Sequence, residues 1–365
     1  MLSKIYLVVW GFCLFALTSS AQVVYYSADQ FKILGKAVSD GTYKRLPDIM
    51  ADKLRKPVRL LGNNSAGLSI RFRSNTTSVS VRWESLGNHR MNHMADVGVK
   101  GVDLYTLEDG HWRFVNSGRP VDKKTEARII SNMQPKEREY MLNLPLYDGI
   151  VSLEIGVDSL SSIGMPRVEL PVCKDKIIMY GTSILQGACA SRPGMAHTNI
   201  ISRKMNREVI NLGFSGNAFL DLEIASLMAQ LDAGIFILDF VPNASPEQME
   251  ERMIPFYKIL REKHPDTPVL FIEDPYFPTT FYDERISFEV KRKNATLNKI
   301  FQDMEAAGEQ NIYLLHSDDL IGTDGEATVD GIHFSDLGMM RYADKVISVI
   351  SVSYTHLRAH ETPEH

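Results

Sequence analysis

The spacing of apolar residues changes near residue 165, and this change constrains the fold more than any other feature of the chain. Before it, apolar and polar side chains alternate, as at Leu68, Ile70 and Phe72. A period of two buries one face of a strand. After it, strand-length apolar runs are each followed by a helix-length segment, the order of a parallel sheet with crossover helices. Because 365 residues exceed one ordinary core, two domains are expected.

The first part, residues 22–165, is predicted to be a β-sandwich of the jelly-roll kind. Short strand candidates are separated by turn dipeptides such as Asp109-Gly110. Residues 166–175 contain two prolines and are predicted to be a linker. The strand candidates are residues 68–72, 79–83, 97–105, 112–116, 140–144 and 151–157.

The second part, residues 176–351, is predicted to be a three-layer α/β/α domain around a parallel sheet. One helix start is clearly marked, because Ser245 and Gln248 have the spacing of a capping box and Pro246 stands at the first helical position. The last helix is expected at residues 337–350. The strand candidates are residues 177–180, 209–212, 235–240, 269–273 and 312–315.

The N-terminal residues 1–21 are typical of a secretory signal peptide. Lys4 precedes an apolar stretch at 5–17, and small residues follow at 19–21. A membrane anchor is the alternative, but the stretch is shorter than the roughly 20 residues that span a bilayer. No later segment is apolar enough to span a membrane. We therefore expect export to a periplasm or to the outside of the cell.

The C-terminal residues 352–365 break from the apolar helix pattern that precedes them. They resemble a translated sequencing-adapter read-through, in which case they are non-native. The alternative is a disordered polar tail. Either reading leaves these residues outside the predicted fold.

Composition excludes two classes of protein. The formal net charge is -5, and no stripe of basic and aromatic residues is present, so the sequence offers no surface that would bind nucleic acid. After signal removal only Cys173 and Cys189 are left, too few for a disulfide scaffold. One disulfide is possible, but two buried free thiols are the preferred interpretation.

Four short sequence motifs in the second part contain residues that are typical of a catalytic site. Ser183 follows the first strand, Gly216 the second and Asn243 the third, while Asp330 and His333 precede the last helix. Open parallel sheets bind their ligands at the carboxyl ends of the strands. Together these residues supply a nucleophile, a base with an acidic partner, and oxyanion donors. That set can hydrolyse an ester through an acyl-enzyme.

Each signal taken alone has an ordinary explanation. Ser183 could be a helix N-cap, Gly216 a turn glycine, Asn243 a loop amide and His333 a surface residue. The occurrence of all four in this order favours a catalytic site. No Gly-x-Ser-x-Gly elbow occurs in the chain, which disfavours an ordinary α/β-hydrolase.

Residues 176–350 resemble an SGNH (GDSL-type) serine hydrolase, a family named after a serine, a glycine, an asparagine and a histidine in separate blocks. Residues 101–105, Gly-Val-Asp-Leu-Tyr, resemble the signature of a β-domain that often precedes such hydrolases. The block containing Asn243 reads Val-Pro-Asn-Ala and departs from the usual Gly-x-Asn-Asp, and Thr182 stands where many members have Asp. The matching residues are Ser183 in Gly-Thr-Ser, Gly216 in Ser-Gly-Asn, Asn243, and Asp330 three residues before His333.

The resemblance implies a flavodoxin-like hydrolase domain and a serine esterase mechanism. In it, His333 removes the Ser183 proton, and Asp330 orients His333. The oxyanion would be bound by the N–H groups of Ser183 and Gly216 and by the Asn243 amide. No metal and no organic cofactor are implied.

The substrate is expected to be an acyl ester of a small molecule or glycan, above all an acetyl ester of a carbohydrate. Two alternatives stay open, a hydrolase of lipids or thioesters and a carbohydrate-binding protein that has lost activity. Oligomeric state also stays open. In the β-domain, we expect residues 101–105 to wall the cleft or hold a polymer.

Three other groups of residues are weaker candidates. A metal pair at His89 and His93 with Asp96 would need a helix, whereas the local pattern favours surface histidines. An acidic loop lacks the spacing of a calcium site and is expected to be solvated. Two acidic residues at the end of the fourth strand could line the cleft or cap the following loop, and the structural role is the preferred interpretation. These acidic residues are Asp318, Asp319 and Asp324 in the loop and Glu273 and Asp274 at the end of the strand.

Overall fold

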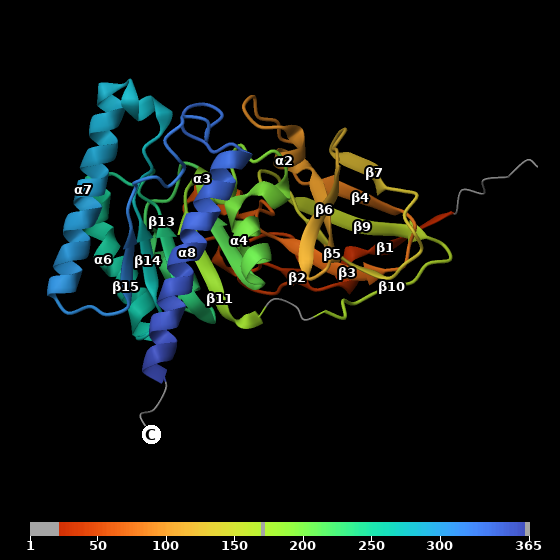
Figure 1. Cartoon of the computed structure of the whole chain (residues 1–365), viewed down its shortest axis with the longest axis horizontal. Coiled ribbons are helices and arrows are strands. Elements are labelled where there is room, and N and C mark those ends of the chain that lie inside the picture. Colours follow the sequence, from red (N-terminus) through yellow and green to blue (C-terminus); the bar gives the residue numbers. More distant parts are fainter. Residues whose placement is uncertain (1–21, 169–171, 362–365) are drawn as a thin grey trace, which may run out of the picture.

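A computed structural model describes residues 22–168 and 172–361, with side chains omitted at 172–174 and 353–361. Figure 1 shows a β-rich N-terminal domain beside a C-terminal domain in which helices cover a sheet. The predicted signal peptide at 1–21 lies outside the described residues.

The N-terminal domain is a sandwich of two antiparallel sheets, as predicted. Ile70 and Phe72 from one sheet share a buried apolar core with Val81 and Trp83 from the other. The first sheet has the order β1 (Val23–Ser27), β9 (Ile150–Asp158), β4 (Val79–Ser85) and β7 (Lys124–Ile130). The second has the order β10 (Ile163–Gly164), β3 (Ser69–Ser74), β8 (Arg138–Asn143), β5 (Val102–Glu108) and β6 (His111–Gly118), with β2 (Ile33–Leu34) paired to β3.

The strand predicted at 97–105 is wrong over its first residues, which form a short helix. The helix α2 (Asp96–Lys100) ends before β5 begins, and its turn closes through the Gly101 N–H bonded to the Val97 carbonyl at 3.0 Å. A Cβ at Gly98 would lie 2.4 Å from the Ala190 carbonyl oxygen of the other domain. This close interdomain contact outweighs the strand propensity of the valines. The other helical segments of the domain are η1 (Ala28–Gln30), η2 (Asp48–Met50) and α1 (Lys56–Gly62).

The C-terminal domain contains all five predicted strands in one parallel sheet. Counted in chain order, the strands lie side by side as 2-1-3-4-5, the flavodoxin-like arrangement. The first strand begins at Val172, inside the segment predicted as a linker. The order across the sheet is β12 (Arg207–Gly213), β11 (Val172–Gly181), β13 (Ala233–Asp239), β14 (Val269–Ile272) and β15 (Ile312–Leu315).

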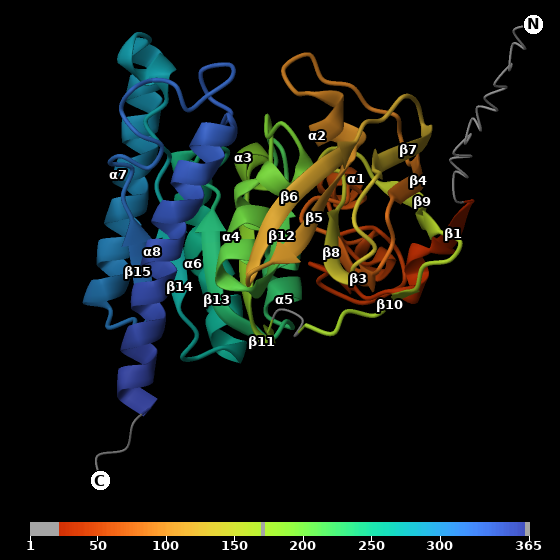
Figure 2. The same ribbon diagram turned by 45° about the vertical axis from the view of Figure 1, so that its right-hand side comes forward.

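Helices cover both faces of this sheet, giving the predicted three layers (Figure 2). Ile177 and Met179 of β11 pack in one core, whereas Ile178 and Tyr180 pack in the core on the opposite face. The capping box at the start of α6 is present, with Ser245 accepting from the Gln248 N–H. One face carries α4 (His197–Met205) and α8 (Asp336–Glu361), and the other carries α5 (Leu222–Met228), α6 (Pro246–Lys263) and α7 (Glu284–Ala306).

The last helix extends beyond its predicted end at residue 350. Helix α8 continues to Glu361, so the prediction of a disordered tail is wrong for residues 352–361. The sequence from 351 to 361 contains neither glycine nor proline, and nothing in it stops a helix once the preceding turns have formed.

The two domains share apolar cores. Leu46, Leu54 and Val58 of the N-terminal domain pack in the same cluster as Ile210 and Leu212 of β12. On the other face of the sheet, the apolar cluster of the C-terminal domain includes Val99, Leu146 and Tyr147 of the N-terminal domain. The domains are therefore joined by packed apolar interiors.

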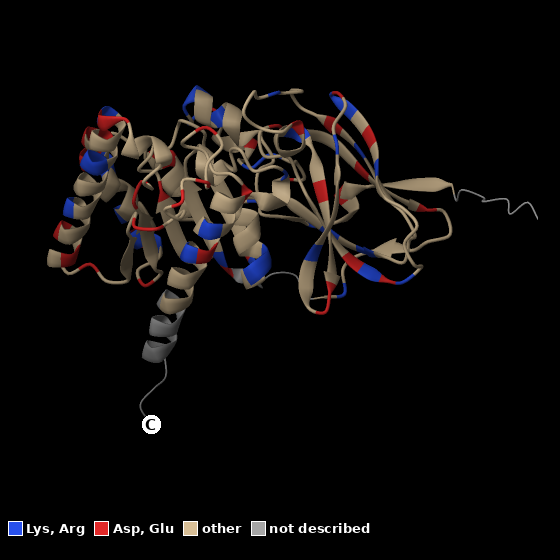
Figure 3. Cartoon of the chain, turned by 45° about the horizontal axis from the view of Figure 1, so that its top comes forward, with Lys and Arg blue, Asp and Glu red and all other residues tan. Residues whose placement is uncertain are grey.

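The surface of the described chain carries mixed charges. Figure 3 shows basic and acidic residues interspersed over both domains. Among residues 22–168 and 172–361, no helix combines the length and the apolar character that crossing a membrane requires.

Candidate active site

Three strands of the parallel sheet end at the same level. Gly181 at the end of β11 pairs with Gly213 of β12 on one side and with Asp239 of β13 on the other. A Cβ at Gly181 would lie 2.5 Å from the Asp239 carbonyl oxygen, so glycine allows the strands to approach closely here. The loops that carry Ser183, Gly216 and Asn243 therefore begin side by side.

Ser183 is the first residue of the short helix α3 (Ser183–Gln186), and Thr182 is its N-cap. The Thr182 hydroxyl accepts a hydrogen bond from the Ile184 N–H at 3.3 Å. The capping role that could have explained Ser183 thus belongs to its neighbour. The Ser183 hydroxyl instead forms a hydrogen bond with His333 Nε2 at 3.0 Å.

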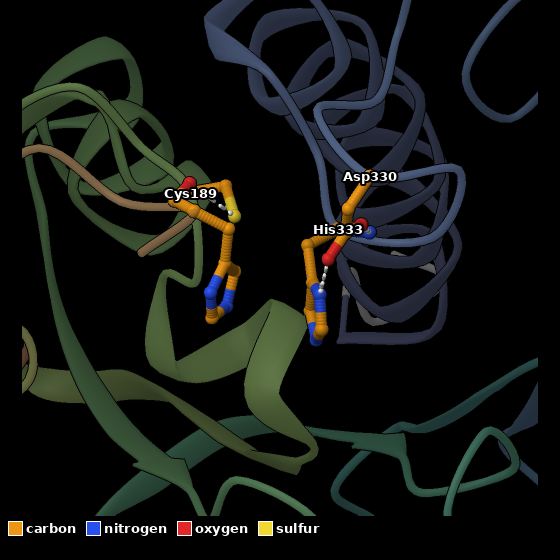
Figure 4. Close-up of side chains that lie close together, drawn as sticks. Cys189, Asp330 and His333 are labelled. Carbon is orange, nitrogen blue, oxygen red and sulfur yellow. Dashed lines mark hydrogen bonds and ion pairs between the residues drawn. The ribbon is translucent and has the colours of Figure 1, made fainter. Parts of the chain in front are cut away.

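His333 lies between Ser183 and Asp330. Its Nδ1 is 2.7 Å from Asp330 Oδ2, and its backbone N–H donates to Asp330 Oδ1 at 2.8 Å (Figure 4). Burial opposes ionisation of Asp330, but the hydrogen bonds from His333 prevail and hold the pKa of this carboxyl below its ordinary value. An ionised Asp330 fixes the ring with Nδ1 protonated and leaves Nε2 to accept a proton.

Gly216 and Asn243 occupy the neighbouring loops. Gly216 has φ +65°, but a Cβ there would meet nothing within 4 Å. The left-handed backbone conformation favours glycine at this position. Asn243 Oδ1 accepts from the Ala218 N–H at 3.2 Å, which leaves Nδ2 as the end of the amide that can donate to an oxyanion.

Gln186 supports the Gly216 loop and was not identified from the sequence. Its Oε1 accepts from the Ser215 N–H at 3.1 Å, and its Nε2 donates to the Leu146 carbonyl of the β-domain at 3.0 Å. Because this side chain is fully buried, it connects the second loop of the site to the domain interface.

His93 lies beside the site, and its interpretation as a surface histidine is wrong. Its ring centroid is 5.6 Å from that of His333, and the residue is half-buried. His89 is exposed, as expected, and Asp96 at the start of α2 is 3.6 Å from Arg90 and 3.8 Å from Lys100. The loop between β4 and α2 thus brings one of the two histidines next to His333 of the other domain.

Cys189 is a buried free thiol, in agreement with the preferred interpretation. The side chain of Cys173 lies outside the described part of the chain. The Cys189 Sγ donates to the His93 carbonyl oxygen at 3.3 Å. Burial raises the pKa of Cys189 to about 12, and the charge of Asp330 contributes to the same shift.

The predicted contact between residues 101–105 and the substrate is wrong, because this segment is buried at the domain interface. Asp103 is fully buried and accepts from Arg192 Nη1 and from the Gly194 N–H, both at 2.8 Å. Arg192 Nη1 also lies 2.5 Å from the Tyr105 hydroxyl. The motif therefore joins the two domains.

Three of the other acidic candidates have polar partners. Glu273 accepts from the Ser317 N–H at 2.6 Å, as the structural interpretation predicts. Asp319 and Asp324 are exposed, as expected, and pair with basic residues of α8, Lys345 at 3.1 Å and Arg341 at 2.7 Å. Asp318 is exposed as well.

Two carboxyl groups are buried beneath the site. Burial, together with the nearby charge of Asp274, raises the pKa of Asp239 to about 8. Burial also raises the pKa of Asp274 to about 7. Asp239 is the last residue of β13, so a largely protonated acid lies at the end of a central strand.

The fold and the site geometry agree with sequence comparisons. A model described as the GDSL-like lipase/acylhydrolase family matches residues 174–351, and a model described as GxDLY, the N-terminus of SGNH-type esterases, matches residues 23–163. No curated protein matches the chain.

Similar solved structures include a protein described as a GDSL-like lipase from Bacteroides ovatus, with 38% identity, a TM-score of 0.88, and coverage of 92% of this chain and 98% of that one. The salicylyl-acyltransferase SsfX3 of a tetracycline biosynthetic pathway has 17% identity, a TM-score of 0.74, and coverage of 91% and 98%. A family two carbohydrate esterase from Cellvibrio japonicus has 10% identity, a TM-score of 0.60, and coverage of 92% and 99%. The last two show the fold alone. The chain belongs to the SGNH (GDSL-like) hydrolases and is an enzyme of the carboxylic ester hydrolase class.

Proposed function

We propose that the protein is an exported serine esterase that removes short acyl groups, above all acetyl, from carbohydrates. One observation carries the catalytic part of this proposal, the continuous hydrogen bonding from Ser183 Oγ to His333 Nε2 at 3.0 Å and from His333 Nδ1 to Asp330 at 2.7 Å. This is the geometry of a nucleophile, its base and the group that orients the base.

In the first half of the reaction, Ser183 Oγ bonds to the ester carbonyl carbon while its proton passes to His333 Nε2. The negative charge moves to the carbonyl oxygen, where the N–H groups of Ser183 and Gly216 and the Asn243 Nδ2 can donate to it. The imidazolium, stabilised by Asp330, then gives its proton to the departing alcohol oxygen as the ester bond breaks.

In the second half, a water molecule attacks the acyl-enzyme. His333 removes the proton of the water, and the same donors stabilise the oxyanion. Collapse of this intermediate breaks the bond to Ser183 Oγ, which recovers its proton from His333. A carboxylic acid leaves, and the free enzyme is restored.

The substrate part of the proposal, an acetyl ester of a carbohydrate, is supported by separate observations. The ring of His93 of the β-domain lies beside that of His333, with 5.6 Å between ring centroids, and adds a polar side chain next to the proposed base. Polar surroundings favour a small acyl group on a hydrophilic alcohol. Family two carbohydrate esterases share the two-domain fold, and the expected signal peptide would bring the enzyme to extracellular glycans.

A second candidate is hydrolysis of longer acyl esters, because large apolar side chains are exposed close to the catalytic loop. Val329 and Ile332 flank Asp330 and His333 and are exposed. Phe281, in η4 (Pro278–Phe281), and the adjacent Tyr282 are exposed as well. A hydrogen bond between the Thr279 hydroxyl and the Gly331 carbonyl, at 3.1 Å, connects η4 to the catalytic loop. Such an apolar rim could hold a fatty acyl chain.

The experiment measures kcat/KM for aryl esters from acetyl to octanoyl and acetate release from acetylated oligosaccharides. We expect a steep fall with chain length and acetate from at least one glycan. A preference for octanoyl that is lost in Phe281→Ser, with no acetate from any glycan, would establish the second candidate instead.

Ser183→Ala is the control for the mechanism. It should abolish turnover of every ester while leaving the melting temperature and circular dichroism unchanged, because only one hydroxyl is removed. Full activity of this variant would overturn the catalytic assignment.

A further inference from the structure

We propose that His93, Cys189, Asp330 and His333 form a binding site for Zn²⁺, and that zinc bound there switches the catalytic triad off. One ligand atom from each residue lies within 4.8 Å of all the others. Figure 4 shows Cys189 on one side and the adjacent Asp330 and His333 on the other. Inhibition rests on the proposed function, whereas zinc binding does not.

The four residues come from three separate segments and from both domains. His93 lies in the loop between β4 and α2, Cys189 follows α3, and Asp330 and His333 precede α8. Cys189 has φ +66°, an uncommon conformation for a residue with a Cβ. The hydrogen bond from its Sγ to the His93 carbonyl, at 3.3 Å, fixes these two segments against each other.

The donor set fits zinc better than a hard cation. Two imidazoles, a thiolate and a carboxylate are the nitrogen, sulfur and oxygen ligands that zinc binds in tetrahedral sites, whereas calcium and magnesium select oxygen. Zinc bonds of about 2.0–2.3 Å place the ligand atoms of a tetrahedron about 3.3–3.8 Å apart. The ligand atoms, which lie within 4.8 Å of one another, must therefore move about 1 Å closer together to bind zinc. Asp330 is exposed and His93 half-buried, so their side chains have room to rotate.

Zinc at this position is incompatible with the triad, whichever nitrogen of His333 it binds. Bonding through Nε2 replaces the hydrogen bond to Ser183, and bonding through Nδ1 replaces the hydrogen bond to Asp330. In the first case the serine loses its base, and in the second the base loses the group that orients it. The Cys189 thiol releases its proton to solvent on binding, and no oxidant or reductant takes part.

The first experiment measures zinc binding by isothermal titration calorimetry on the whole chain, without any substrate. We expect one Zn²⁺ per chain, and a loss of affinity of roughly 100-fold in His93→Ala and in Cys189→Ser, as expected when one of four ligands is removed. His89→Ala is the matched control, because this exposed histidine lies in the same loop and is not part of the cluster. It should bind zinc like the wild type.

The second experiment titrates Zn²⁺ into the esterase assay and follows each variant relative to its own zinc-free rate. Wild type and His89→Ala should be inhibited over the concentration range in which calorimetry shows binding, and a chelator should restore the rate. The His93→Ala and Cys189→Ser variants should need about 100-fold more zinc.

Any of three results would overturn the proposal. The first is no zinc binding at 100 µM, about 100 times the concentration at which a micromolar site is half-filled. The others are zinc binding that is unchanged in both ligand variants, and zinc binding that does not inhibit an active enzyme. If the protein hydrolyses no ester tested, the calorimetry still decides whether the site exists, so failure of the proposed function is distinguishable. Melting temperatures of all variants show whether lost binding reflects lost folding.

Discussion

Asp103 of the β-domain accepts a hydrogen bond at 2.8 Å from the guanidinium of Arg192 in the hydrolase domain. The carboxylate is completely buried, and its second oxygen accepts from Asn143 Nδ2 at 2.8 Å. One carboxylate oxygen therefore bonds across the domain interface, and the other bonds within the β-domain. A buried charge that loses its partner is costly, so this contact should show in stability rather than in substrate affinity.

Asp103→Asn should lower the free energy of unfolding by about 3–5 kcal/mol, because a neutral amide leaves the Arg192 guanidinium without its buried counter-charge. Urea unfolding followed by circular dichroism measures the change. Asp109→Asn is the control, because Asp109 is exposed and its substitution should cost less than about 0.5 kcal/mol. Equal stability of the two variants would show that Asp103 does not join the domains.

Asp330→Asn should lower kcat by about 10⁴, since an amide at this position favours the wrong tautomer of His333 and cannot stabilise its imidazolium. The matched control is Asp319→Asn, which makes the same chemical change at a residue that pairs with Lys345 at 3.1 Å. Steady-state kinetics on an aryl acetate compare the two. An active Asp330→Asn enzyme would remove this residue from the triad.

Asn243→Ala should lower kcat by about 10²–10³, the usual effect of losing one oxyanion donor, with little change in KM. The backbone is expected to hold, because the Asn243 N–H bonds to the Phe240 carbonyl at 3.0 Å and is unaffected by the substitution. A parallel rise in KM with constant kcat would instead indicate a role in substrate binding.

Activity should fall on acidification with a slope of about one in log kcat/KM against pH. The His333 imidazole must be neutral to accept the Ser183 proton. The hydrogen bonds from His333 hold the pKa of Asp330 below its ordinary value, so this carboxylate stays ionised over the range in which histidine takes up a proton. A pH–rate profile tests the slope, and a profile that stays flat until the protein unfolds in acid would exclude a histidine base.

Stability should decline as the pH rises from about 4 to 8. Burial raises the pKa of Asp239 from 3.8 to about 8, so over this window the folded protein holds a proton that the unfolded chain releases. Asp239→Asn imitates the protonated acid and should reduce the slope of unfolding free energy against pH by up to about 1.4 kcal/mol per pH unit. Urea unfolding at several pH values measures this slope. An unchanged slope would mean that Asp239 is ionised in the folded protein.

The sequence predicted the parallel sheet well because its strands are apolar throughout and are bounded by turn and capping signals. Ser183, Gly216, Asn243 and His333 could be located because each follows or precedes such an element at a fixed distance. Spacing along the chain carries this information directly, since the carboxyl ends of parallel strands meet at one edge.

The sequence could not predict contacts that depend on how the two domains meet. His93 reaches His333, and Asp103 reaches Arg192, across 240 and 89 residues of chain respectively. The same limitation explains α2, where close packing of Gly98 against Ala190 determines the backbone conformation. No local periodicity encodes these contacts.

The shared interior of the two domains also constrains how the chain can fold as it is made. Leu46, Leu54 and Val58 leave the ribosome long before Ile210 and Leu212, against which they pack. Until β12 is synthesised, the first domain exposes apolar side chains that its own sandwich does not cover, and chains in that state are prone to aggregate. The second domain expressed alone lacks the side chains of the first domain that complete its apolar core. The protein should therefore unfold in a single transition, and neither half should be exchangeable for a foreign domain.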